Sequence, residues 1–177
     1  MADIDYVELY DKGLKYGPIK ISYFNVHHLG VTYGYCPEVN GTRVVYVSDN
    51  EVHFLKSSVA KRIHEFDEDE HELLEWMVSE QRSAELSSIE NVDILIHDAQ
   101  YTPPDYDKKR GWGHSCYVDT VNLAIDANVK CLYLYHHDPT YNDDQVNTIH
   151  RDCLQILKER KSDMESRVAR EGAKIEL

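Results

Sequence analysis

The alternation of apolar and polar residues in the first third of the chain predicts an antiparallel sheet. The ranges 19–26 and 32–39 are rich in β-branched and aromatic residues, and 43–47 is the expected return strand of a hairpin. Asn40 and Gly41 separate the last two ranges, and both residues tolerate the positive φ that a tight hairpin turn requires. Three consecutive strands with short connections are therefore expected.

From residue 67 onward the pattern changes to helices alternating with short apolar strands. A helical period predicts helices over 67–86, 115–127 and 143–171. Two apolar runs bounded by polar residues, at 92–96 and 130–135, predict buried strands. This strand-helix-strand-helix order predicts an α/β layered domain.

Several details of these elements are expectations that a structure can test. Asp67 or Asp69 is expected to cap the first helix, whose apolar side chains should face inward: Leu73, Leu74, Trp76 and Met77. The acidic run before them contains His64 and His71, and a charged, solvated helix start explains it without a metal. The end of the chain, 174–177, is expected to form a closing edge strand.

Polar residues that suit catalysis or metal binding follow four of the predicted strands. In chain order they are His27-His28, Asp49, His97-Asp98 and His136-His137-Asp138, with His114 added at a glycine-rich helix start. A single histidine at a strand end is more often an ordinary satisfied polar residue than a ligand. Here the pattern recurs, and adjacent strands bring their ends together in space. Imidazole and carboxylate are ligands for zinc, iron or manganese, so the pattern predicts a metal or acid/base site.

The length of the chain predicts one domain, and its charge argues against broad binding to nucleic acids or anionic membranes. The chain has 177 residues, enough for one domain with a hydrophobic core. Acidic residues outnumber basic ones by 32 to 19, and the formal net charge is −13. A broad attraction to nucleic-acid phosphates or to an anionic membrane surface is therefore not expected.

Cysteine spacing and the terminal segment favour a cytoplasmic protein. No two cysteines form a CxxC pair, so we expect reduced and mostly buried thiols: Cys36, Cys116, Cys131 and Cys153. The acidic start, Met1–Asp5, lacks the apolar segment of a signal peptide, and no apolar run approaches membrane-spanning length.

Five stretches, in order, carry a resemblance to a known family: HHLGVTYGY, VVYVSDNE, DILIHDAQY, RGWGHS and LYHHDP. They resemble the metallo-β-lactamase-fold hydrolases, in particular the branch with ribonuclease Z and small cyclic phosphodiesterases. The ending REGAKIEL also resembles theirs. The resemblance covers residues 20–177 and implies the C-terminal half of an αββα sandwich. We expect residues 1–177 to form this half as a single domain.

The resemblance implies roles for five residues. His28, Asp49 and His136 match metal ligands, with Asp49 as the carboxylate that bridges two metals. His114 matches the histidine that helps to protonate the leaving group, and Asp98 matches the acidic residue that orients it. The implied cofactor is a pair of divalent ions, zinc, iron or manganese.

Neighbouring residues compete for two of these assignments. His27 stands beside His28, and His137 stands beside His136. If His136 is the ligand, His137 and Asp138 are expected to support a metal ligand or to face the substrate.

The family's best-known motif, HxHxDH, is missing, because no HxH occurs in the chain. Three explanations stay open: a split gene with the other half in a partner polypeptide, a fragment of a longer protein, or a degenerate homologue. The completeness of the remaining motifs favours the first two. Half a sandwich would leave one sheet face uncovered, so we expect an N-terminal-half partner chain or a homo-oligomer.

The leading hypothesis is a metal-dependent hydrolase acting on a small phosphodiester or nucleotide-like substrate. The alternatives are a metallo-hydrolase of a thioester, lactone or other ester, since the same scaffold serves several chemistries, and a non-catalytic partner subunit with a vestigial site.

Overall fold

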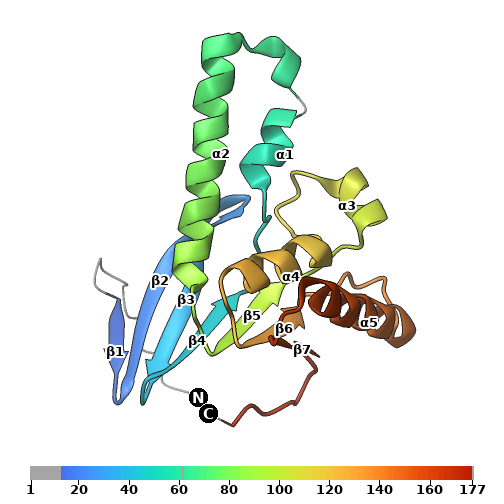
Figure 1. Cartoon of the computed structure of the whole chain (residues 1–177). Coiled ribbons are helices and arrows are strands. Elements are labelled where there is room, and N and C mark those ends of the chain that lie inside the picture. The colour runs from blue at the N-terminus through green and yellow to red at the C-terminus, as the bar shows by residue number, and fades with distance from the viewer. Residues whose placement is uncertain (1–12, 61, 177) are drawn as a thin grey trace, which may run out of the picture.

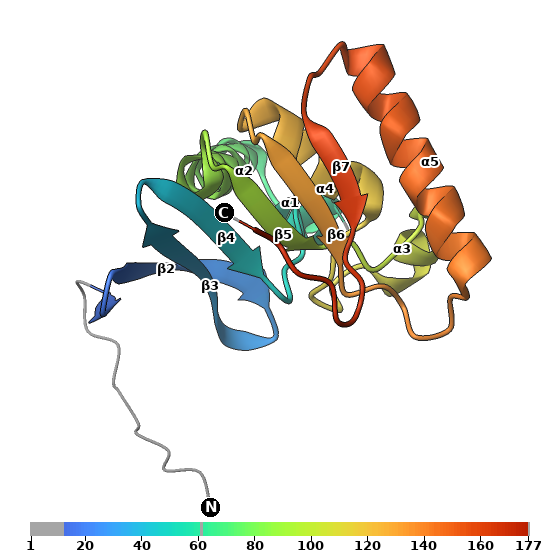
Figure 2. The same ribbon diagram turned by 90° about the horizontal axis from the view of Figure 1, so that it is seen from below.

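A seven-stranded mixed sheet runs through the computed structural model, which describes residues 13–60 and 62–176 (Figures 1 and 2). The strands lie in chain order: β1 (Leu14–Tyr16), β2 (Ile19–His28), β3 (Gly30–Val39), β4 (Thr42–Val47), β5 (Ile94–Asp98), β6 (Cys131–Tyr135) and β7 (Glu165–Val168). Strands β1 to β4 pair antiparallel, and β4 to β7 pair parallel. The predicted α/β class is confirmed.

Helices connect the strands of the parallel half and pack on one face of the sheet (Figure 2). They are α1 (Phe54–Ala60), the short 3-10 turn Ile63–Glu65, α2 (Glu68–Ile89), α3 (Pro103–Lys109), α4 (Tyr117–Asp126) and α5 (Asp143–Arg160). The core lies between α4, α5 and the sheet, and its fully buried members include Val45, Leu95, Val121, Leu132 and Leu134.

The three predicted antiparallel strands form, joined by an unpredicted short strand, β1, and with shifted bounds for β2 and β3. Asn40 and Gly41 have φ values of 52° and 83°, so the predicted hairpin turn between β3 and β4 is present. The strand expected to end at residue 26 continues to His28, and β3 begins at Gly30. His27 and His28 are therefore strand residues with fixed, opposite side-chain directions.

The expected helix over 143–171 is wrong in its second half. Helix α5 ends at Arg160 because Lys161 adopts the left-handed conformation (φ 53°) and its N–H caps the carbonyls of Leu157 and Lys158. The chain then turns and adds β7 to the parallel edge. The expected edge strand over 174–177 is also wrong for 174–176, which contain no strand, and Leu177 lies outside the described residues.

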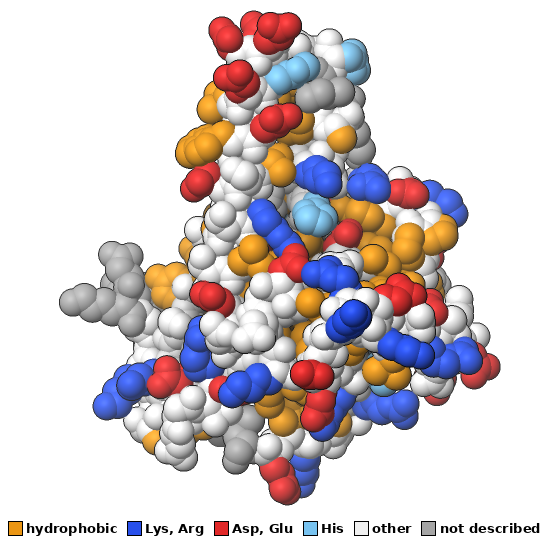
Figure 3. Space-filling model, viewed as in Figure 1, with side chains coloured by type: hydrophobic (Ala, Val, Ile, Leu, Met, Phe, Trp, Pro, Cys, Tyr) orange, Lys and Arg blue, Asp and Glu red, His pale blue; other side chains and the backbone are white. Residues whose placement is uncertain are grey.

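Helices α1 and α2 form an arm that projects from the sheet (Figure 1). Asp67 caps α2 through a reciprocal capping box with Glu70, as expected for that residue. The expectation of an inward-facing apolar stripe is wrong for Leu73, Trp76 and Met77, which are exposed. Most of α2 extends beyond the sheet, where α1 is its neighbour among the described elements. Figure 3 shows apolar side chains along the arm below an acidic tip.

Glu85 lies where the arm joins the body, and its side chain is largely buried. Gln81 donates to its Oε1 at 2.7 Å, while within the described residues its Oε2 has no hydrogen-bond partner. Burial raises the pKa of Glu85 to about 7, against the opposing effects of Gln81 and Arg82. The ionised form is therefore disfavoured in the folded state.

Glu85→Gln is expected to stabilise the protein at alkaline pH. A raised carboxyl pKa means that folding keeps a proton which the unfolded chain releases near pH 4.5. Stability is thus full below that pH and falls as pH rises to about 7, by about 3 kcal/mol. Urea unfolding should show the variant more stable by this amount at pH 8 and equal to the wild type near pH 4.5. Glu80→Gln, on the exposed face of the same helix, is the control. A Glu85→Gln difference that does not vary with pH would contradict the assignment.

The face of the sheet opposite the helices carries apolar side chains. A shallow pocket of about 270 Å³ on it is lined by Ile19, Pro37, Val39, Val44, Ile94 and Ile175. The expectation of a partner chain or homo-oligomer covering this face stays a prediction.

The expectation for the thiols is confirmed. All four cysteines are free; three are buried and Cys131 is partly exposed. None of the helices in the described ranges has the length and apolar character needed to cross a bilayer. The acidic start, on which the expectation about a signal peptide rests, lies outside the described residues.

Candidate functional site

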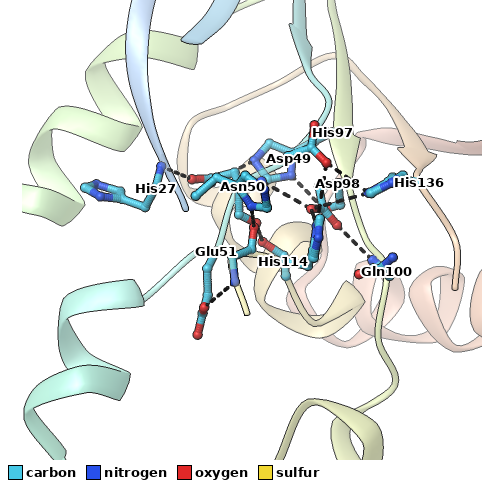
Figure 4. A network of polar contacts seen from close by, with 12 residues as sticks. His27, Asp49, Asn50, Glu51, His97, Asp98, Gln100, His114 and His136 are labelled. Atoms are coloured by element: carbon cyan, nitrogen blue, oxygen red, sulfur yellow. Dashed lines mark hydrogen bonds and ion pairs between the residues drawn. The ribbon is translucent and has the colours of Figure 1, made fainter. Parts of the chain in front are cut away.

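The carboxyl ends of β4, β5 and β6 meet at one rim of the sheet because these strands are parallel. Asp49 follows β4, Asp98 ends β5 and His136 follows β6. His28 arrives at the same rim from the end of β2. His114 comes from the loop before α4 and lies beside Asp98 (Figure 4). The structure thus brings together all five residues that the sequence singles out.

Two overlapping groups of side chains lie close enough to share a metal ion. In one, His28, Asp49 and His114 each offer a ligand atom within 4.8 Å of the others; in the second, Asp98, His114 and His136 do the same. The ring of His114 lies between the other two imidazoles, with both centroid distances at 4.9 Å. His114 belongs to both groups.

Asp98 anchors His114 from a fully buried position. His114 Nδ1 donates to Asp98 Oδ2 at 2.7 Å, so its Nε2 is the nitrogen left for other chemistry. The second oxygen, Oδ1, accepts the N–H of Gln100 at 3.0 Å. Burial acts to raise the pKa of Asp98, but the hydrogen bond with His114 and the nearby imidazole of His136 outweigh it, so the pKa is lowered. The carboxylate is held ionised beside its imidazole.

His136 faces both acidic residues. Its Nδ1 lies 3.6 Å from Asp49 Oδ1 and 3.8 Å from Asp98 Oδ2. The Asp98 carboxylate raises the pKa of His136, against the effect of burial. Its backbone has φ 58°, a left-handed conformation that is uncommon outside glycine and asparagine. Strained backbone of this kind is concentrated at functional sites.

Asn50 fastens the strand ends to one another, a role that sequence reasoning missed. Its Oδ1 accepts the backbone N–H of His27 at 2.8 Å, and its Nδ2 donates to His97 Nε2 at 3.3 Å. Its own N–H donates to Asp98 Oδ2 at 3.2 Å, and its carbonyl accepts from Ser115 Oγ. Asn50 thereby connects β2, β5 and the start of α4. Its position directly after Asp49 is the sequence signal that could have found it.

The two competing histidines lie outside both close groups. The ring of His27 stacks on Phe54, and its Nε2 lies 4.0 Å from Glu85. Figure 4 shows this ring pointing away from His114 and His136. The ring of His137 lines a separate pocket with Asn147 and Arg170 among others, and burial lowers its pKa. Among the described residues, the groups that could hold a metal therefore contain His28 and His136.

Asp138 is engaged elsewhere. It accepts from Lys109 Nζ at 2.7 Å and from Thr140. Burial alone would raise the pKa of Asp138, but these bonds lower it to about 2. It fastens the loop after β6 to α3.

The donor set fits a divalent metal, although incompletely. It consists of imidazole nitrogens and carboxylate oxygens, which suit zinc, iron and manganese. His136 Nδ1 is buried without a hydrogen-bond partner among the described residues and faces Asp49, as a ligand nitrogen would. Each close group offers three side chains, and a tetrahedral ion takes four ligands. The remaining positions would fall to water, substrate or other protein groups.

Comparison with known proteins establishes the fold. Over 92% of the chain, the structure is similar to a metallo-β-lactamase-fold protein from Bacillus subtilis (TM-score 0.60, 18% identity) and to the short form of human tRNase Z (TM-score 0.54, 15% identity). A diphosphatase of the PhnP family matches 95% of it (TM-score 0.54, 16% identity). The chain covers 52%, 45% and 47% of these proteins, respectively. It therefore has the metallo-β-lactamase fold, as the sequence motifs predict, over about half of that fold.

The sequence comparison is more local. A segment of 69 residues is 32% identical to ribonuclease Z of Streptococcus suis, covering 39% of this chain and 22% of that enzyme. A segment of 58 residues is 40% identical to ribonuclease Z of Saccharolobus solfataricus, covering 33% and 19%. No protein-family model matches the chain. The matched segments thus span about a fifth of the length of these relatives.

Proposed function

We propose that this chain provides the C-terminal half of a metal-dependent hydrolase that cleaves phosphodiesters. One observation carries the proposal: His28, Asp49, His114 and His136 converge at the rim of the sheet around a buried Asp98. The fold and the local similarity to ribonuclease Z support the same class of chemistry.

The proposed ligands are His28, Asp49 and His136, with Asp49 shared between two divalent ions. Its Oδ1 lies 3.6 Å from His136 Nδ1 and 3.9 Å from His114 Nδ1, so its carboxylate is centrally placed for a bridging role. When bound, such ions lower the pKa of a shared water and polarise the phosphoryl oxygens.

His114 is the proposed proton donor to the leaving oxygen. Its Nδ1 proton is committed to Asp98, so Nε2 carries the proton that is transferred when the ring is charged. Asp98 would hold the ring in this orientation and stabilise the imidazolium form. A histidine suits this task because its ordinary pKa lies close to neutral pH.

The proposed centre is completed by an N-terminal half, in the same polypeptide or in a partner chain. Three ligands are too few for two ions, and the solved proteins of this fold are about twice as long as the matched region. The apolar face of the sheet opposite the helices is the proposed contact surface for that half.

The proposed substrate is a small phosphodiester or a nucleotide-like molecule. The net charge of −13 opposes broad binding of a polyanion such as structured RNA. The reaction would add water across one P–O bond and release an alcohol and a phosphomonoester.

The test combines metal analysis with a substrate panel. The full chain, alone and together with an N-terminal half, is supplied with Mn²⁺ or Zn²⁺ and assayed on bis-p-nitrophenyl phosphate, cyclic nucleotides, a thioester and a lactone. We expect bound metal and phosphodiester hydrolysis in the completed protein. Activity confined to the thioester or lactone would contradict the phosphodiester substrate and favour a hydrolase of that other ester. An absence of bound metal in the completed protein would favour a non-catalytic subunit with a vestigial site.

A further inference from the structure

Glu51 is a buried carboxylate that the proposed chemistry does not use. It follows Asp49 and Asn50 in the sequence, and its side chain is inaccessible to solvent. Three groups donate to it: the hydroxyl of Tyr106 in α3 and two backbone N–H groups of the loop that leads to His114. Gly111 N–H lies 2.9 and 3.0 Å from its two oxygens, Gly113 N–H lies 3.0 Å from Oε2, and Tyr106 Oη lies 2.9 Å from Oε1.

The backbone of Gly113 links Glu51 to His28. Its N–H donates to Glu51, and its carbonyl lies 3.0 Å from His28 Nδ1. A carbonyl oxygen only accepts hydrogen bonds, so His28 Nδ1 carries the hydrogen. The lone pair of a neutral His28 ring is then on Nε2, the nitrogen available to a metal ion.

The geometry of the loop leaves room for nothing larger than glycine at this link. Gly113 has φ +89°, a conformation that side chains rarely adopt, and a Cβ there would fall 2.1 Å from His28 Nδ1. Gly111, the other backbone donor, has φ +85°. Glu51 thus binds the N–H groups of two glycines in a left-handed conformation that other residues rarely adopt.

We propose that Glu51 is a positioning residue that fixes the tautomer of His28 and the placement of His114. It does so by holding the Gly111–Gly113 loop, and the backbone of Gly113, bonded to both side chains, then fixes the His28 ring. The inference rests on the proposed function in one respect: it takes His28 Nε2, the nitrogen without the hydrogen, as a metal ligand.

The burial of the Glu51 carboxylate favours a positioning role over a role in filling space in the interior. Transferring a charged group out of water is costly unless hydrogen bonds satisfy it, and an apolar side chain would fill the same space without that cost. Glu51 accepts three different donors, all from residues 106–113. Its carboxylate therefore serves the loop that precedes His114.

Glu51→Gln tests the inference while keeping the shape of the side chain. Glutamine has one acceptor oxygen and an NH₂ group, so an amide donor would face the N–H of Gly111 or Gly113. Long-range ¹H–¹⁵N NMR of the full-length, metal-free chain reports the protonation of each imidazole nitrogen. We expect His28 to be protonated on Nδ1 in the wild type and to become a mixture of tautomers in the variant. In Zn²⁺ titrations the variant should bind about 10–100-fold more weakly.

Two further variants separate positioning from stability. Tyr106→Phe removes one donor to Glu51 but leaves both glycine bonds, so it should lower the melting temperature without changing the His28 tautomer. Gly113→Ala acts at the other end of the link and should displace the His28 ring, reproducing the tautomer mixture with Glu51 intact. It also keeps the inference testable if Glu51→Gln does not fold.

The two readouts distinguish this inference from the proposed function. A changed His28 tautomer in Glu51→Gln, where the wild type binds no Zn²⁺ even with an N-terminal half supplied, would support positioning and count against the metal centre. A wild type that binds Zn²⁺, with a folded Glu51→Gln that keeps both the His28 tautomer and the affinity, would overturn the positioning role alone.

Discussion

Asp49→Ala is expected to abolish metal-dependent hydrolysis in the completed protein. In the proposed centre the Asp49 carboxylate is shared by two ions and stands within 4 Å of two imidazoles. Loss of a group that merely supports a ligand weakens metal binding or activity by about 10–100-fold, so loss of the shared ligand should exceed about 100-fold. The measurements are metal content by mass spectrometry and the initial rate on bis-p-nitrophenyl phosphate.

Asp69→Ala is the matched control, because Asp69 is an exposed aspartate in the first turn of α2, on the projecting arm. It should retain wild-type metal content and rate. An Asp49→Ala protein with wild-type activity would remove Asp49 from the centre and with it the dinuclear proposal. Loss of activity with full metal content would instead assign Asp49 a role toward water or substrate.

The location of the site could be predicted from the sequence because it depends on strand ends. In parallel pairing, the residues after β4, β5 and β6 must reach the same rim, so Asp49, Asp98 and His136 are brought together by topology alone. The choice between His27 and His28 needed the structure. Side chains along a strand point alternately to its two faces, so the rings of His27 and His28 point in opposite directions. The pairing register of β2 with its neighbours decides which of the two rings faces the rim.

Other features depend on contacts that no local pattern contains. Asn50 and Glu51 act through partners 23 to 65 residues away, so their roles appear only once the strands are paired. The end of α5 depends on the left-handed Lys161, a residue type that favours continuing a helix. The exposed stripe of α2 arises because the helix extends beyond the sheet that would have covered it. In each case tertiary context overrides a sound local propensity.

His114→Ala is expected to impair hydrolysis in a way that depends on the leaving group. A proton donor matters most when the departing oxygen is a poor leaving group, such as an alkoxide, and such groups contribute about 10²–10⁴-fold to rate. p-Nitrophenolate departs readily without a proton. The variant should therefore lose about 10²–10⁴-fold on a methyl or nucleoside phosphodiester and far less on bis-p-nitrophenyl phosphate. His150→Ala, whose ring donates to the Ser166 carbonyl away from the rim, is the control.

This comparison also decides between two roles that the geometry offers to His114. The residue belongs to both groups that could hold a metal, and its Nδ1 is hydrogen bonded to Asp98. As a proton donor, it should be dispensable for metal binding, and the loss of rate should track the leaving group. As a ligand, its removal should lower metal content and slow both substrates equally. Asp98→Asn is expected to follow whichever pattern His114→Ala shows, because Asp98 acts on substrate through the orientation and charge of that ring.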